Sequence, residues 1–411
     1  MNEIIKKIEG GITAAKGFQA ASCAAGIKYK DRLDMAMIYS EKPCVVAGAF
    51  TKNIVKAAPV IWDQTIVKES DVVHGVVVNA GIANACTGQE GHISCEVSAE
   101  TFAKEFGIDK KAVLVASTGV IGKQLPQDKL NAGIRTMRKT LSTTLEAGTT
   151  SAKAIMTTDT VKKEIAVQFE IDGIVVTVGG MCKGSGMIHP DMCTMLSFIT
   201  TDIAITKELL QKALSEDILD TYNMISVDGD TSTNDTVLLL ANGEAGNELI
   251  SEENEGYLQF AKALRIVNEY LAKKMAGDGE GATALFEVTV KGAMTKADAV
   301  TISKSVITSS LTKAAIFGHD ANWGRILCAM GYAGAKFDPS LVELSFHSVN
   351  GDIDIAKNGF ALDFDEEKAT HILSAEEVTA LIDLHMGDKS ATAWGCDLTY
   401  DYVKINADYR S

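Results

Sequence analysis

The sequence predicts an α/β protein of the α+β type, a layered sandwich in which mixed or antiparallel sheets pack between helices. Apolar, β-branched runs and glycine turns dominate the first half, while the second half alternates helix-like and strand-like segments. Hairpin signals outnumber clean strand–helix–strand units, which favours mixed or antiparallel sheets. Hydrophobic residues make up 46% of the 411 residues, enough for a large core and for two or three domain-sized units.

Strands are predicted where a short apolar run ends at a turn signal. The predicted strands of the first half cover residues 72–79, 112–117, 165–169, 174–178 and 195–202. Asp172-Gly173 separates the third run from the fourth and predicts a hairpin between them. In the second half, residues 285–290 predict a strand, and the alternation of residues 398–407 predicts another at the end of the chain.

Helices are predicted where apolar residues recur every three or four positions. These ranges are 129–147, 207–217, 256–275 and 296–308. The third range stops at the glycine-rich residues 277–281. Ser374 and Glu377 match a capping box and predict one more helix over residues 378–385.

The charge balance excludes several classes of partner. The chain carries 39 basic and 54 acidic residues, a net charge of −15, and no basic run. Nucleic acid and anionic membranes are therefore not expected to bind. No stretch approaches the ~20 apolar residues of a membrane span, and the first residues show no targeting signal. We expect a cytoplasmic protein.

Cysteine and histidine spacing gives no sign of a metal or a cofactor. The eight cysteines form no Cys-x-x-Cys pair, the seven histidines form no H-E-x-x-H, and no nucleotide-binding glycine motif is present. We expect free, mostly buried thiols. Cys86, in a polar turn, is the one thiol with a reactive setting, but packing in the core or the turn is the favoured interpretation. Asp228, Asp230 and Asp235 imitate a cation loop, but their spacing is not that of an EF-hand, and hydrogen-bonded turns are favoured.

A threonine near mid-chain carries the sharpest functional signal. Residues 183–193 form a glycine-containing approach that ends at the small Cys193, and Thr194 heads the apolar run 195–202. If the Thr194 hydroxyl attacks the Cys193 carbonyl and the bond breaks, Thr194 gains a free α-amine beside its hydroxyl. Such an amine titrates near about 7.7–8.0, so a useful fraction is neutral base at pH 7. An ordinary loop and strand start fits the same local pattern.

Motifs along the whole chain together resemble one family. Residues 184–196, followed by Thr201-Asp202, resemble the self-cleavage signature of the glutamate N-acetyltransferase/ornithine acetyltransferase family of arginine biosynthesis. Further matching stretches are residues 11–14, 17–18, 84–88, 118–122, 156–160, 228–235, 277–283, 322–327 and 405–411. Their joint order is specific. Four positions depart from the family pattern: Asp191 replaces Asn, Cys193 replaces Ala, Ala321 replaces Pro and Ser411 replaces Thr.

The resemblance implies a fold, an activity and an assembly. The fold would be similar to that of self-processing aminopeptidases. Residues 1–193 would form an alpha chain and residues 194–411 a beta chain, assembled as a heterotetramer of two of each. Acetyl would pass from N²-acetylornithine to glutamate, and some members also use acetyl-CoA as donor. No cofactor or metal is implied.

The resemblance also assigns roles to residues. Thr194 would be the cleavage nucleophile, with Cys193 before the scissile bond, and would carry the acetyl group. Thr118 and Gly119 would form the oxyanion hole. Substrate contacts would come from Thr157, Lys183, Thr194, Glu280, Asn406 and Ser411. Lys183 suits an amino-acid carboxylate, and Glu280 suits an ammonium group.

Two other functions remain open from the residues. A self-processing hydrolase or aminopeptidase would use the same nucleophile and release the acyl group to water. A non-catalytic binding protein would keep the fold but lose Thr194 or the Thr118-Gly119 pair, and all of these are present. His189 could act as a base, but the amine of the nucleophile makes it unnecessary.

Overall fold

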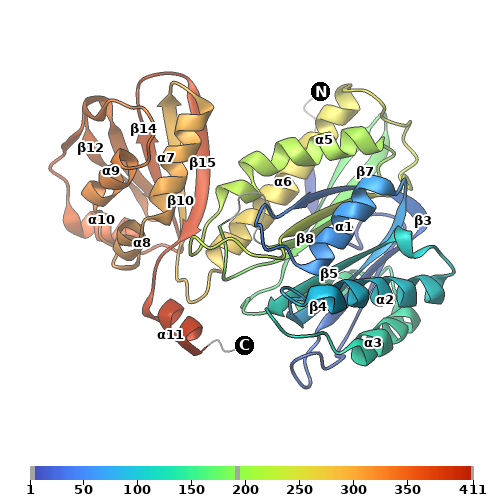
Figure 1. Ribbon diagram of the computed structural model, residues 1–411. Helices are drawn as coiled ribbons and strands as arrows, with labels where there is room; N and C mark the ends of the chain where they lie inside the picture. Colours follow the sequence, from blue (N-terminus) through green and yellow to red (C-terminus); the bar gives the residue numbers. More distant parts are fainter. Residues whose placement is uncertain (1–4, 190–194, 409–411) are drawn as a thin grey trace.

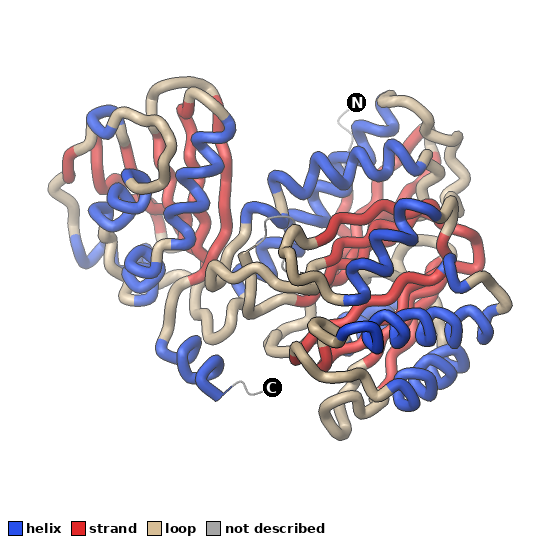
Figure 2. The backbone as a smooth tube through the Cα atoms, viewed as in Figure 1, coloured by secondary structure: helices blue, strands red, loops and turns tan. Residues whose placement is uncertain are grey.

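The computed structural model describes residues 5–189 and 195–408, which fold into two lobes (Figure 1). Within these ranges the larger lobe holds a nine-stranded sheet and the smaller lobe a six-stranded one. Figure 2 shows the strands gathered in these two sets, with helices around each.

The large lobe is built from β1 to β9 and α1 to α6. The strands are β1 (Lys6–Ile8), β2 (Phe18–Cys23), β3 (Met35–Phe50), β4 (Val73–Ile82), β5 (Val113–Val120), β6 (Lys163–Ile171), β7 (Ile174–Lys183), β8 (Leu196–Thr201) and β9 (Thr236–Ala241). The helices are α1 (Ala58–Glu69), α2 (Gly88–Phe106), α3 (Gln127–Thr140), α4 (Leu145–Ala154), α5 (Lys207–Asp217) and α6 (Glu255–Gly277). The strand order is β1-β6-β7-β8-β9-β3-β4-β5, with β2 on β3.

The long strand β3 divides the large sheet into two parts. Its first half pairs with β2 and β4, and its second half, from Val45 to Phe50, pairs with β9. The register shifts between Tyr39 and Cys44, where Pro43 cannot donate a ladder hydrogen bond. The bend lets the two parts of the sheet face each other.

Alternation along the strands then produces four layers. Met35 and Met37 pack with α2 and α3, whereas Ala36 and Ile38 point into a core that they share with Phe198 of β8. The outer face of β6 and β7 packs on α6. Helices, two facing sheets and helices follow one another, so the predicted layered sandwich is confirmed.

The small lobe is a mixed sheet with helices and leads into the C-terminal helix. Its strands are β10 (Leu285–Ala293), β11 (Glu343–Ser348), β12 (Gly351–Lys357), β13 (Phe360–Ala361), β14 (Glu377–Asp383) and β15 (Lys389–Cys396), and its helices are α7 (Lys296–Thr308), α8 (Ser310–Phe317), α9 (Trp323–Gly331) and α10 (Glu366–Leu373). The final helix α11 (Tyr400–Asp408) lies apart from this sheet (Figure 1). The lobes separate near residues 278–285, whereas β7 and β8, on either side of residues 190–194, are neighbours in one sheet.

Most predicted elements are confirmed. The five predicted strands of the first half correspond to β4, β5, β6, β7 and β8, and β6 and β7 form the hairpin around Asp172-Gly173. Helices α5, α6 and α7 and strand β10 also match their predictions. Within the described ranges, no helix combines the length and apolar character needed to cross a membrane.

The predicted helix over residues 378–385 is wrong, because this segment is the central strand β14. Val378, Ala380 and Ile382 are buried at alternate positions, and β14 pairs with both β10 and β11. Ser374 ends α10 instead of starting a helix, since its hydroxyl donates to the His371 carbonyl at 2.8 Å. Pairing with two neighbouring strands overrides the local capping signal.

Two further predictions need correction. Residues 398–407 do not form a strand, because Tyr400–Asp408 is helical. Its half-buried Tyr402 and Ile405 are three residues apart, which is helical spacing. The helix predicted over residues 129–147 is two helices, α3 and α4, interrupted where Ser142 bridges to Ala20.

Candidate active site

One cavity of about 370 Å³ collects the ends of elements that are far apart in the sequence. It is lined from the ends of β5 and β7, the loop before β6, the start of β8, the loop before β9, the loop after α6, and α11. Every site residue predicted within the described ranges lines it: Thr118, Gly119, Thr157, Lys183, Glu280 and Asn406. Cys193, Thr194 and Ser411 lie outside the described residues, but Met195, the residue after Thr194, lines the same cavity.

The end of β5 places Thr118 and Gly119 at the cavity. Gly119 has a φ of 130°, and a Cβ there would lie 2.2 Å from the carbonyl carbon of Gly81 on β4. Only glycine fits this close approach. Lys183 Nζ donates to Thr118 Oγ1 at 3.2 Å. Because that hydroxyl accepts from an ammonium group, its own hydrogen is left to donate into the cavity.

Lys183 is a buried cation at the end of β7. Its backbone pairs with Leu196, the first residue of β8, and its side chain lines the cavity. Burial lowers the pKa of Lys183 below its ordinary value, and the negative charge of Asp159 opposes this shift. A buried ammonium group is a strong partner for a ligand carboxylate, because few water molecules compete for it.

Glu280 and Asn406 meet on the other side of the cavity. Asn406 Nδ2 donates to Glu280 Oε2 at 2.8 Å, and this contact joins α11 to the loop after α6. The Glu280 carboxylate lies against Gly186, where a Cβ would come within 2.3 Å of Glu280 Cδ. Glu280 is only 8% exposed, so its charge is available chiefly to a group inside the cavity.

The sequence prediction did not assign Asn234 and Asp235, which also line the cavity. Asn234 Nδ2 donates to the carbonyls of Ala83 at 2.6 Å and Ser117 at 2.8 Å, so it holds the end of β5 just before Thr118. Burial raises the pKa of Asp235 well above its ordinary value. Both belong to the motif of residues 228–235, whose resemblance to the family was the available signal.

Other residues considered from the sequence have structural partners. The N–H of Asp230 donates to Asp228 Oδ1 at 3.3 Å, which confirms a hydrogen-bonded turn, and Asp228 also accepts from the N–H groups of Met187 at 2.6 Å and Ile188 at 2.8 Å. His189 Nδ1 lies 3.1 Å from Ser226 Oγ. His189 is not one of the described residues that line the cavity. Cys86 is exposed, in agreement with its predicted turn.

Most of the remaining thiols are buried. Among the described cysteines, Cys44, Cys95, Cys182 and Cys396 are free and buried, Cys23 is half-buried, and Cys328 is exposed. The expectation of free, mostly buried thiols is therefore confirmed for this part of the chain.

Comparison with known proteins decides the family. The ArgJ family model matches residues 19–411. This chain belongs to the ArgJ family. It is 54% identical to the arginine biosynthesis bifunctional protein ArgJ 1 of Clostridium acetobutylicum, covering 97% of each chain, and 49% identical to the ArgJ protein of Thermotoga neapolitana, covering 96% of this chain and 99% of that one.

A solved relative supports the same assignment. The crystal structure of the arginine biosynthesis bifunctional protein ArgJ from Bacillus halodurans is 46% identical and matches with a TM-score of 0.50. The match covers 53% of this chain and 100% of that chain. The family resemblance stated from the sequence is confirmed, and the chain is an enzyme of this family.

Proposed function

We propose that this enzyme moves an acetyl group from N²-acetylornithine to glutamate through Thr194, in the biosynthesis of arginine. The observation that carries the proposal is the convergence of oxyanion donors, a buried cation and a buried carboxylate in one cavity beside Met195. The names of the relatives, which place those proteins in arginine biosynthesis, support it.

The proposed reaction has two halves. The Thr194 hydroxyl attacks the acetyl carbonyl of N²-acetylornithine, its proton passes to the α-amine of Thr194, and ornithine leaves with that proton. The neutral amine of glutamate then attacks the acetyl ester, the bond from the acetyl carbon to the Thr194 oxygen breaks, and the α-amine of Thr194 passes the proton lost by glutamate to that oxygen. Thr118 and Gly119 would stabilise the oxyanion in each half, because their donors meet charge that exists only in the transition state.

Substrate binding follows from the charges of the cavity. Donor and acceptor share an α-carboxylate, which Lys183 would hold in both halves. The side-chain ammonium of ornithine compounds would meet Glu280, with Asn406 orienting that carboxylate at 2.8 Å. Thr157 lines the same cavity. Ser411 completes the proposed set.

Cleavage between Cys193 and Thr194 is part of the proposal, since only cleavage frees the amine. Residues 194–411 would be the beta chain, and they make up 53% of the sequence, the same share that the complete Bacillus halodurans chain matches. Residues 1–193 would remain bound, because β7 pairs with β8 and β3 pairs with β9 across the cut.

A second donor is also proposed. The relatives are named bifunctional, and acetyl-CoA would be a chemically suitable second source of acetyl for the same threonine.

We also propose that the enzyme is cytoplasmic and that it assembles from two alpha and two beta chains. Light scattering should then give a mass near twice 43.7 kDa.

The deciding assay incubates purified enzyme with N²-acetylornithine, with and without glutamate, and separately with acetyl-CoA and glutamate. Transfer to glutamate supports the proposal. Release of acetate without an acceptor would indicate the hydrolase, and silence would indicate a binding protein. Product from acetyl-CoA tests the second donor independently.

A further inference from the structure

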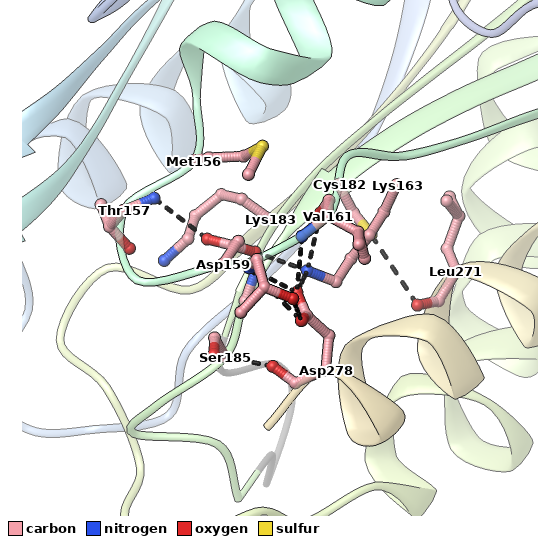
Figure 3. A network of polar contacts seen from close by, with 12 residues as sticks. Met156, Thr157, Asp159, Val161, Lys163, Cys182, Lys183, Ser185, Leu271 and Asp278 are labelled. Atoms are coloured by element: carbon pink, nitrogen blue, oxygen red, sulfur yellow. Dashed lines mark hydrogen bonds and ion pairs between the residues drawn. The ribbon is translucent and has the colours of Figure 1, made fainter. Parts of the chain in front are cut away.

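A cluster of buried charges lies beside Thr157 and Lys183, two residues that line the cavity; Figure 3 shows its contacts. Lys163, at the start of β6, places Nζ 2.7 Å from Asp159 Oδ1 and 2.5 Å from Asp278 Oδ2. The side chains of Lys163 and Asp159 are fully buried, and that of Asp278 is 8% exposed. Neither acidic residue lines the cavity or has a part in the reaction proposed above.

Asp159 holds two cavity-forming segments with one carboxylate. The N–H of Thr157 donates to Asp159 Oδ2 at 3.0 Å, and the N–H of Gly184, next to Lys183, donates to Asp159 Oδ1 at 2.7 Å. Thr157 lies in the loop before β6, and Lys183 ends β7. The carboxylate therefore fixes the distance between two residues that are proposed to contact substrate.

Asp278 ties the third segment to the same cluster. Its carboxylate accepts from the N–H of Thr160 at 3.1 Å, and its carbonyl accepts from Ser185 Oγ at 2.7 Å. The N–H of Glu280 donates to the Ser185 carbonyl at 3.1 Å. The segments that carry Thr157, Lys183 and Glu280 are thus joined through one buried network.

The charges of this network also act on Lys183. Burial alone would raise the pKa of Asp159, but Lys163 and Lys183 outweigh it and hold that pKa at about 2. Asp159 is therefore ionised at every working pH. The titratable groups that act on Lys183 are Asp159 and Lys163, together with Asp235 and Glu280, which line the cavity. Burial raises the pKa of Asp235, so Asp235 acts on Lys183 only where it is ionised.

We propose that Asp159 is a positioning residue for substrate binding: its carboxylate fixes Thr157 and Lys183 relative to each other and sets a negative charge against the segment that carries Lys183. This inference rests on the proposed function. Burial lowers the pKa of Lys183, and the negative charge of Asp159 raises it. Removing that charge should therefore let Lys183 lose its proton at a lower pH. A neutral Lys183 would bind a carboxylate poorly.

The test is the pH dependence of KM for N²-acetylornithine and for glutamate in Asp159→Asn. An amide keeps one acceptor but loses the charge. In the wild type, KM should rise at the pH where Lys183 deprotonates. In Asp159→Asn this rise should begin at a lower pH for both substrates, because the negative charge that opposes the effect of burial on Lys183 is gone, with kcat changed less than KM.

Two variants separate positioning from a general loss of stability. Asp217→Asn is the matched control, because Asp217 is also buried and ion-paired, to Arg265 at 2.5 Å, but lies outside the cavity. It should lower the melting temperature and leave the pH profile unchanged. Lys183→Arg in the Asp159→Asn background should abolish the rise of KM with pH, since arginine stays charged.

The outcomes are distinct. If the wild type is active and Asp159→Asn shows the same pH dependence of KM, the assignment of Asp159 is overturned. If the wild type itself is inactive, the proposed function is overturned. If Asp159→Asn does not fold, Asp159→Glu keeps the charge but displaces the carboxylate by one methylene. It should raise KM at every pH without moving the profile, and an unchanged KM would contradict the positioning role.

Discussion

Thr118 and Lys183 reach the cavity from the ends of β5 and β7 and are both buried, whereas Asn406 reaches it from α11, none of whose described residues is buried. The strand-end wall, formed by Thr118 and Lys183, is held by sheet pairing and buried charges. The α11 wall is attached to neighbouring loops by two hydrogen bonds, from Asn406 to Glu280 at 2.8 Å and from Tyr402 Oη to Asp228 at 3.3 Å. The effects of substitution should therefore decline from the strand ends to α11.

The strand-end wall should give the largest effect. Thr118→Ala removes a donor that acts on the oxyanion, so kcat should fall roughly 10²–10³-fold with little change in KM. Thr101→Ala is the matched control, because Thr101 is equally buried, at 8% exposure, and bonds to Asn131 far from the cavity. Steady-state kinetics on both variants checks this. Equal activity in the two would remove Thr118 from the mechanism.

Lys183→Met should come next. Both half-reactions lose the same carboxylate partner, so kcat/KM for each should fall roughly 10–100-fold, the worth of a hydrogen bond to a charged group. Lys313→Met removes another buried lysine, whose Nζ donates to the Cys396 carbonyl at 2.6 Å, and should spare both half-reactions. Loss of acetylornithine cleavage alone would show that Lys183 acts on Thr194 and not on a shared carboxylate.

Glu280→Gln should discriminate between the substrates. The amide can still accept from Asn406 but carries no charge, so the ornithine half-reaction should lose about tenfold in kcat/KM, less than the full worth of a charged hydrogen bond. The glutamate half-reaction should change less, because glutamate has no side-chain ammonium group. Each half-reaction can be followed by mass spectrometry of the acetylated products. Equal losses would refute the assignment of Glu280 to the ammonium group.

The α11 wall should show the smallest effect. Asn406→Ala removes one neutral donor, worth about 1 kcal/mol, so KM for N²-acetylornithine should rise about fivefold. Combined with Glu280→Gln, the loss should be less than the sum of the two free energies, because the residues share one hydrogen bond. A loss for Asn406→Ala as large as that for Thr118→Ala would contradict the division between the two walls.

The contrast between the walls also explains what could be predicted from the sequence. The strands that carry Thr118 and Lys183 are buried on both faces, so their continuous apolar runs predict them from the sequence. Helix α11 has little burial to impose a period, and the chance alternation of residues 398–407 predicted a strand. Strand β14 was missed because its pairing with β10 and β11 is not encoded by the Ser374 capping signal.

The site divides in the same way. Residues that meet substrate could be assigned through the family resemblance, since their motifs carry recognisable chemistry. Asp159 and Asn234 lie in matching motifs, but their roles are not evident from the motifs because they act through the backbone of other segments: Asp159 on Gly184, and Asn234 on Ser117. Such contacts join residues 25 and 117 positions apart, and only the folded chain brings them together.

The central claim is that Thr194 is both the nucleophile that cleaves the chain and the residue that carries the acetyl group. Intact-mass spectrometry of purified enzyme, mixed with N²-acetylornithine in the absence of glutamate, measures both at once. We expect two fragments, residues 1–193 and 194–411, with the second heavier by one acetyl group until glutamate is added. A single full-length species that still transfers acetyl, or an active enzyme whose second fragment never gains that mass, would contradict the account.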